Sequence, residues 1–109
     1  MPDVFYETEG LQHGGGYDMG ISLRNPSKTA SVTCTLLVFN EKEDLTYNIT
    51  LQPKQAEAFM LSSIHTKVKN SKQLPEGFYQ AYLIGPVTNT VWLMKEDQVQ
   101  AQVKIPTYG

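Results

Sequence analysis

The chain contains 109 residues, of which 40% are hydrophobic and 18% are charged, and its formal net charge is −2 at pH 7. This length fits a single domain over residues 1–109, and the composition is that of an ordinary globular protein with one modest core. No apolar run approaches the roughly 18 residues that cross a bilayer, and nine Lys and Arg residues provide no concentrated footprint for nucleic acid.

The dominant sequence period is two, which is typical of strands with one buried face. In 98–105, Val99, Ala101, Val103 and Ile105 alternate with glutamine and lysine, so we expect these four side chains to face the core together. Similar segments, rich in β-branched and aromatic residues, occur along the whole chain. In chain order the predicted strands are 3–8, 17–25, 31–40, 45–51, 56–61, 78–84, 88–94 and 98–105.

Turn signals separate these strands. Asn25-Pro26 opens one turn, the charged segment 40–44 forms another, and Pro53 breaks the chain before the strand at 56. Short strands with regular turns predict an all-β fold, a single antiparallel β-sandwich of immunoglobulin-like or jelly-roll-like type with seven to eight strands. The segment 62–73 lacks a clear apolar face, and we expect a long loop there.

The segment "HGGGYDMG" places three consecutive glycines between His13 and Tyr17. A phosphate-binding loop would need a strand before the glycines and a helix after them, usually with a Lys-Ser/Thr pair. A predicted strand follows instead, so we reject that interpretation. Two interpretations stay open: a structural glycine turn, or a ligand contact by His13 and Tyr17 at the edge of the sandwich.

The residues that could support catalysis or metal binding are scattered. His13 and His65 lie far apart in sequence, with no carboxylate or cysteine at ligand spacing. The single cysteine, Cys34, falls on the predicted core face of a strand, where a small buried thiol is common. We therefore expect no metal, no cofactor and no enzyme activity.

The cysteine count and the first residues also bear on location. A single cysteine cannot form an internal disulfide, which suits a reducing compartment. Residues 1–10 have neither the basic nor the long apolar region of a signal peptide. We expect a cytoplasmic protein.

Aromatic residues crowd two predicted strands within 78–94, which we expect to be adjacent. Phe78 and Tyr82 share one face of the first strand, Tyr79 faces the other way, and Trp92 lies on the second strand. One face must belong to the core. The other is either an exposed interface or ligand platform, or it is buried as well because the strands are central. The candidate binding residues are His13, Tyr17, Tyr79, Tyr82 and Trp92.

The segments "ISLRNPSKTASVTCTLLVF", "LQPKQAEAFML" and "LPEGFYQAYLIGPVTNTVWLMKEDQVQA" resemble in layout the sensory rhodopsin transducer family, over residues 20–101. That resemblance implies a small cytoplasmic β-sandwich that oligomerises and acts as a binding or relay partner without catalysis. Residues 92–95 read "WLMK" and lack the histidine and arginine of that family, so no site residue is carried over. The segments "MGISLRNPSKTA" and "LPEGFYQAYL" are similar to the intracellular proteinase inhibitor of bacilli.

Together these observations predict a non-catalytic binding module. The first hypothesis is a protein-interaction or adapter protein that self-associates or binds a protein partner through an apolar sheet face or an edge strand. The second is a small-molecule or carbohydrate binding module that uses His13, Tyr17 and exposed aromatic residues. A protease-inhibitor-like binding protein is a further alternative.

Overall fold

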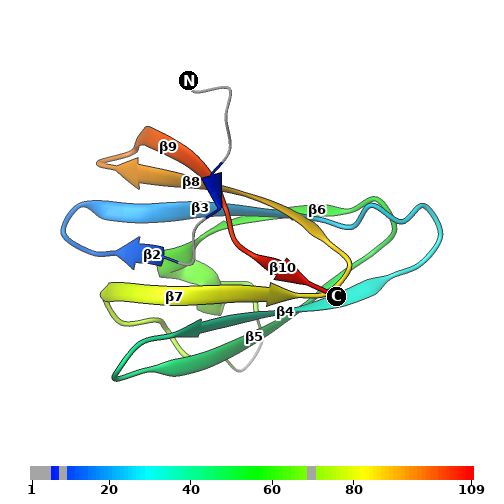
Figure 1. Cartoon of the computed structure of the whole chain (residues 1–109), viewed down its shortest axis with the longest axis horizontal. Helices are drawn as coiled ribbons and strands as arrows, with labels where there is room; N and C mark the ends of the chain where they lie inside the picture. The colour runs from blue at the N-terminus through cyan, green and yellow to red at the C-terminus, as the bar shows by residue number, and fades with distance from the viewer. Residues whose placement is uncertain (1–5, 8–9, 69–70) are drawn as a thin grey trace.

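The computed structural model describes residues 6–7, 10–68 and 71–109, which form two facing β-sheets (Figure 1). The strands are β1 (Tyr6–Glu7), β2 (Gly10–His13), β3 (Tyr17–Arg24), β4 (Val32–Phe39), β5 (Asp44–Leu51), β6 (Ala56–Met60), β7 (Gly77–Ile84), β8 (Thr88–Lys95), β9 (Gln98–Lys104) and β10 (Thr107–Tyr108). The predicted all-β antiparallel sandwich is confirmed, with more strands than the seven or eight expected.

The two sheets have different strand orders. Sheet A runs β1-β9-β8-β3-β6, and sheet B runs β10-β7-β4-β5, with β2 paired to the same strand β7. All pairings are antiparallel except two short parallel ones, β1 with β9 and β10 with β7. The chain therefore crosses between sheets several times, including the step from β7 to β8.

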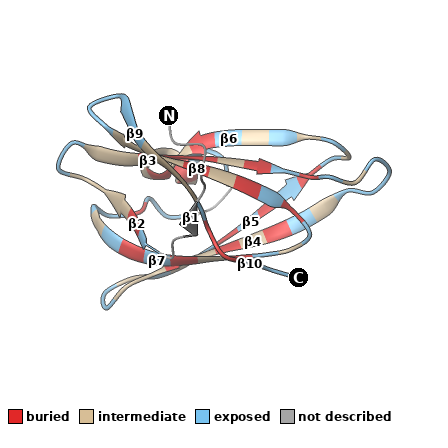
Figure 2. Ribbon diagram, turned by 45° about the horizontal axis from the view of Figure 1, so that its top comes forward, coloured by how far each residue is buried: buried red, intermediate tan, exposed pale blue. Residues whose placement is uncertain are grey.

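The hydrophobic core fills the space between the sheets. Along β4 and β5 buried side chains alternate with partly or fully exposed ones, and the large buried side chains of β3 follow the same two-residue spacing (Figure 2). This alternation follows from the two-residue period of a strand. The inward residues of these three strands are Met19, Ile21, Leu23, Cys34, Leu36, Val38, Tyr47, Ile49 and Leu51.

The last long strand departs from the predicted alternation. Along β9 the pairing with β8 steps from Ala101 directly to Val99, so Gln100 forms a β-bulge. One extra residue reverses the side on which the next side chain points. Val99 is consequently 45% exposed on the outer face, and the prediction that it faces the core is wrong, whereas Ile105 is buried as predicted.

The segment 62–73 is more ordered than a plain loop. It begins with the 3-10 helix η1 (Leu61–Thr66), whose residues Leu61 and Ile64 are buried. The carboxylate of Asp18 accepts hydrogen bonds from the Ser62 backbone N–H (3.1 Å) and from the Ser62 hydroxyl. These contacts fix the start of η1 against β3.

Candidate functional site

The three glycines form a tight turn between the two sheets. The backbone N–H of Gly14 donates to the Tyr17 carbonyl (2.8 Å), and the N–H of Tyr17 donates to the Gly14 carbonyl (3.0 Å). Gly15 and Gly16 have φ values of 62° and 84°, as a type I′ two-residue turn requires. The turn joins β2 in sheet B to β3 in sheet A, so the structural interpretation accounts for all three glycines.

Replacement of Gly14 by alanine should lower the free energy of unfolding by about 2 kcal/mol, because it imposes a strained backbone conformation. Gly14 has a φ of 117°, and an added Cβ would lie 2.8 Å from the Cβ of Glu76. Urea denaturation at pH 7 measures the loss. Gly15→Asn is the matched control, since that position is open and asparagine tolerates its φ of 62°. Equal losses for both variants would contradict this account of the turn.

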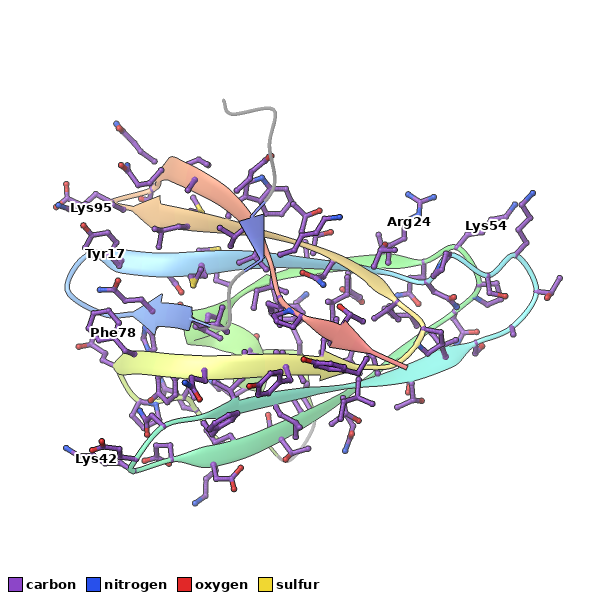
Figure 3. All side chains as sticks on the ribbon, viewed as in Figure 1. Tyr17, Arg24, Lys42, Lys54, Phe78 and Lys95 are labelled. Carbon is purple, nitrogen blue, oxygen red and sulfur yellow. The ribbon has the colours of Figure 1, made fainter. Side chains whose placement is uncertain are left out.

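His13 and Tyr17 flank the turn but serve different local contacts. The Nε2 of His13 lies 3.0 Å from the carbonyl oxygen of Leu74, and the imidazole lines a hollow of about 300 Å³. Tyr17 does not line that hollow; its ring lies 5.1 Å from the Lys95 Nζ, within cation–π distance. Figure 3 shows Tyr17 and Lys95 together at one end of the sandwich. The structure therefore does not unite His13 and Tyr17 in one pocket.

The predicted aromatic pair of strands within 78–94 is divided between the sheets. Because β7 belongs to sheet B and β8 to sheet A, Tyr82 and Trp92 lie on opposite outer faces of the sandwich. Tyr79 is only 3% exposed, and its hydroxyl donates to the Pro75 carbonyl. Tyr79 is therefore a core residue, which corrects its place among the candidate contact residues.

An aromatic row crosses the outer face of sheet B. The ring centroids of Phe39 and Tyr82 lie 5.8 Å apart, and Tyr82 and Tyr108 are also 5.8 Å apart. These rings come from β4, β7 and β10, and Tyr108 is 54% exposed. Tyr82 thus joins two partners that the sequence analysis did not single out.

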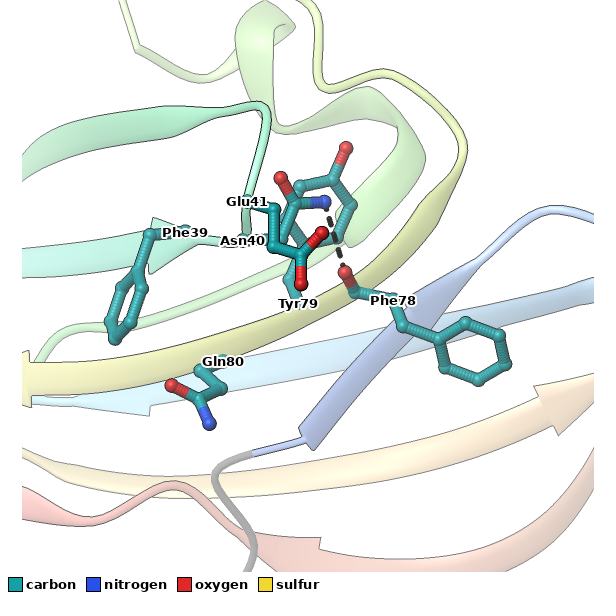
Figure 4. Close-up of a pocket in the computed structure, with 6 residues that line it drawn as sticks. All are labelled: Phe39, Asn40, Glu41, Phe78, Tyr79 and Gln80. Carbon is teal, nitrogen blue, oxygen red and sulfur yellow. Dashed lines mark hydrogen bonds between the residues drawn. The ribbon is translucent and has the colours of Figure 1, made fainter.

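A hollow of about 440 Å³ lies beside the start of β7 (Figure 4). The Asn40 side-chain amide donates to the Phe78 carbonyl (3.0 Å), which ties the turn after β4 to this strand. Phe78 is 73% exposed and also lines two neighbouring hollows of about 300 and 220 Å³. The hollow in Figure 4 is lined by Phe39, Asn40, Glu41, Phe78, Tyr79 and Gln80.

Replacement by serine should have a small effect on stability at Phe78 and a large effect at its neighbour Tyr79. Phe78→Ser should change the free energy of unfolding by less than about 0.5 kcal/mol, because the ring is mostly in solvent. Tyr79→Ser should lower it by at least about 3 kcal/mol, because a large buried ring is lost. Urea denaturation of both variants checks this. A loss above about 1.5 kcal/mol for Phe78→Ser would mean that the ring serves the fold.

The outer face of sheet A carries an apolar groove around Gly20. A Cβ built at Gly20 would lie 3.6 Å from Trp92 Cε3, 3.7 Å from Met60 Sδ and 3.8 Å from Met94 Sδ. The hollow measures about 390 Å³. We call this surface the outer groove; its outward-facing residues are Gly20, Ala58, Met60, Trp92, Met94 and Val99.

Sequence reasoning identified only Trp92 in this groove. Met94 shares the face of Trp92 by the two-residue period, so the strand pattern contained that signal. Met60 belongs to β6 and lies beside Gly20 only because β6 pairs with β3, a pairing that the sequence does not reveal. Val99 faces the groove because of the β-bulge, and the alternating sequence of its segment gives no sign of that bulge.

The described residues offer little for metal-dependent or thiol chemistry. Within the described ranges, no group of three or more His, Cys, Asp and Glu side chains is placed to hold a metal ion. Cys34 is fully buried, and desolvation raises the pKa of its thiol, which disfavours the nucleophilic thiolate. No helix in the described part of the chain is long and apolar enough to cross a membrane.

Comparison with known proteins yields no relative. No protein-family model, no curated protein and no solved structure matches this chain. The resemblances to sensory rhodopsin transducers and to the intracellular proteinase inhibitor therefore stay predictions.

Proposed function

We propose that this chain is a non-catalytic protein-interaction module, an adapter that self-associates and binds a protein partner in the cytoplasm. The outer groove is the observation that carries this proposal. Outer faces of antiparallel sandwiches are normally polar, since only the inner face needs to be buried. Here that face instead gathers a tryptophan and two methionines around a glycine.

The chemistry of the groove favours a protein surface as its occupant. Tryptophan and methionine are enriched in protein–protein interfaces, and contiguous exposed apolar patches commonly mark them. Phe78 supplies a second, separate apolar feature on sheet B. Two separate surfaces are what an adapter requires. The unpaired, buried thiol of Cys34 is compatible with the proposed reducing compartment.

Sedimentation velocity over a wide concentration range tests self-association. We expect the weight-average mass to rise above the 12.2 kDa of one chain as concentration increases from about 1 to about 300 µM, the range typical of small interfaces. A constant mass of one chain across this range would contradict the self-association proposed here.

The aromatic row on sheet B supports a second candidate, a carbohydrate or other small-molecule ligand. Phe39, Tyr82 and Tyr108 offer aromatic surface, and the Thr35 hydroxyl and Asn48 side chain lie on the same outer face. Titration of the labelled protein with an oligosaccharide panel, followed by NMR, tests this. Saturable chemical-shift changes that are confined to the aromatic row and lost in Tyr108→Ala would favour carbohydrate binding. If the resonances of the row do not change, the oligosaccharides of the panel are excluded as ligands of this surface.

A further inference from the structure

We infer that the outer groove is a dimer interface whose occupant is the same face of a second copy of this chain. The second copy is turned about a two-fold axis that crosses the strands at the level of Ile21. This inference rests on the self-association proposed above, and it specifies the surface and the orientation. Three features of the face carry it: its relief, its charges and its area.

The relief of the face is divided into two halves. At one end the strands carry large side chains, since Met60 and Trp92 both pair with Gly20 in the sheet. Two residues further along β3, Ser22 pairs with Ala58 and Thr90. The side chains at this level are therefore small and form a low shelf beside the groove, with Arg24 beyond the shelf at the end of β3.

A two-fold axis across the strands exchanges these halves. It seats Trp92 of one copy over Thr90 of the other, and Met60 over Ala58, because both pairs are equidistant from the level of Ile21. In such an isologous dimer each of these contacts forms twice, so both copies bury their large side chains against the shelf of the other. An axis parallel to the strands would instead place large side chains against large ones and leave the shelves apart. Close packing favours the first arrangement.

The charges on the face agree with the same axis. On β3, β6, β8 and β9, the outward-facing charged side chains among the described residues are Asp18, Arg24 and Lys104. Lys104 lies on β9, away from the middle of the face, whereas Asp18 and Arg24 both lie on β3. They stand at opposite ends of β3, about 20 Å apart at about 3.3 Å per residue. Arg24 projects away from the sheet (Figure 3) and forms no ion pair within the described ranges. The two-fold axis places each Arg24 opposite Asp18 of the other copy.

The area suits a weak dimer. The four strands β3, β6, β8 and β9 contain 28 residues. At a strand spacing of about 4.8 Å and about 3.3 Å per residue they cover roughly 450 Å² per copy. Two copies then bury about 900 Å², the range of weak, transient interfaces. We expect a dissociation constant in the range of about 1 to 100 µM, as for transient complexes of this size.

Sedimentation velocity and the emission of the single tryptophan test the surface. The wild-type protein should approach twice 12.2 kDa as its concentration rises, while Trp92 emission shifts to shorter wavelength. Ala58→Arg should raise the dissociation constant at least a hundredfold, because it places a charge on the shelf. Thr46→Arg is the matched control, an exposed strand position on the outer face of sheet B. It should leave the dissociation constant unchanged.

Charge variants test the orientation. Arg24→Glu should raise the dissociation constant at least tenfold, because it faces Asp18 of the other copy. Adding Asp18→Asn should restore most of the affinity, because the asparagine oxygen can still accept from the Ser62 N–H while its amide donates to the Ser62 hydroxyl. With an axis parallel to the strands, Arg24 would face itself, and the second substitution would restore nothing.

The outcomes separate this inference from the proposal on which it rests. A wild-type dimer that survives Ala58→Arg without a Trp92 shift overturns the inference but leaves self-association intact, and points to edge pairing. A wild-type protein that stays monomeric to about 300 µM overturns both, since interfaces of this size dissociate in the micromolar range. Circular dichroism checks that each variant folds. If Ala58→Arg does not fold, Thr90→Lys replaces it, because Thr90 lies on the same shelf.

Discussion

Replacing Asn89 with alanine should lower the free energy of unfolding by about 3 kcal/mol, because it removes a buried side-chain amide that bonds both backbone groups of Ile105. Asn89 is buried, and its Nδ2 donates to the Ile105 carbonyl (3.0 Å) while its Oδ1 accepts from the Ile105 N–H (2.8 Å). Alanine leaves both backbone groups in the core without this partner, and burying an unsatisfied polar group is expensive.

The position of Asn89 in the topology explains the size of this effect. Ile105 lies between β9 in sheet A and β10 in sheet B, where the chain leaves one sheet for the other (Figure 1). Ile105 takes part in no strand pairing among the described residues, so the Asn89 amide takes the place of a neighbouring strand. Urea denaturation measures the loss. Asn48→Ala, an exposed position, is the control and should cost less than about 0.5 kcal/mol; a similar small loss at Asn89 would contradict this role.

The period-two pattern predicted most strands because core contact requires alternation. The segments 31–40 and 45–51 correspond to β4 and β5, on which alternate side chains are buried. The pattern contains no information on which sheet a strand joins. Consecutive strands usually neighbour each other, so 78–84 and 88–94 were predicted to lie together. At Gly85, with φ of 138°, the chain instead passes close to Cys34 and changes sheet.

The short strand β2 shows a different limit of sequence reasoning. Gly10–His13 has no β-branched residue and only four positions, so its sequence favours a linker as much as a strand. Its pairing with β7 is a tertiary contact, and this contact orders the chain before the glycine turn. Asn89 likewise has the sequence context of an exposed strand residue, and only the fold reveals its buried partner.

The candidate surfaces could be predicted only in part. The alternation in 78–84 separates Phe78 and Tyr82 from Tyr79, and the structure shows this separation, with Tyr79 inside. The phase of a single strand does not say which of its faces is the core. Composite surfaces need neighbours from distant segments: the outer groove draws on β3, β6, β8 and β9, and the aromatic row on β4, β7 and β10.

Alkaline pH should destabilise the protein steeply. Burial raises the pKa of Tyr47 and Tyr79 above the ordinary value of 10.0, with a further contribution from the Glu43 carboxylate, and burial raises the pKa of Cys34 above 9.0. In the folded state these groups keep their protons at a pH where the unfolded chain has lost them. The unfolded state then binds fewer protons, so the free energy of unfolding falls as pH rises. The two tyrosines alone contribute up to about 2.7 kcal/mol per pH unit above pH 10.

Tyrosine-to-phenylalanine variants identify the groups responsible. Tyr47→Phe loses the hydrogen bond from its hydroxyl to the Lys72 carbonyl (3.0 Å) and should be about 1 kcal/mol less stable at pH 7. It also loses one titrating group, so its stability should fall less steeply above pH 10, and its deficit should shrink there. Urea midpoints between pH 7 and pH 11.5 measure both slopes, with Tyr108→Phe, whose ring is 54% exposed, as the control. Identical slopes in Tyr47→Phe, Tyr108→Phe and the wild type would show that the buried hydroxyl does not resist ionisation, and the alkaline sensitivity would then need another source.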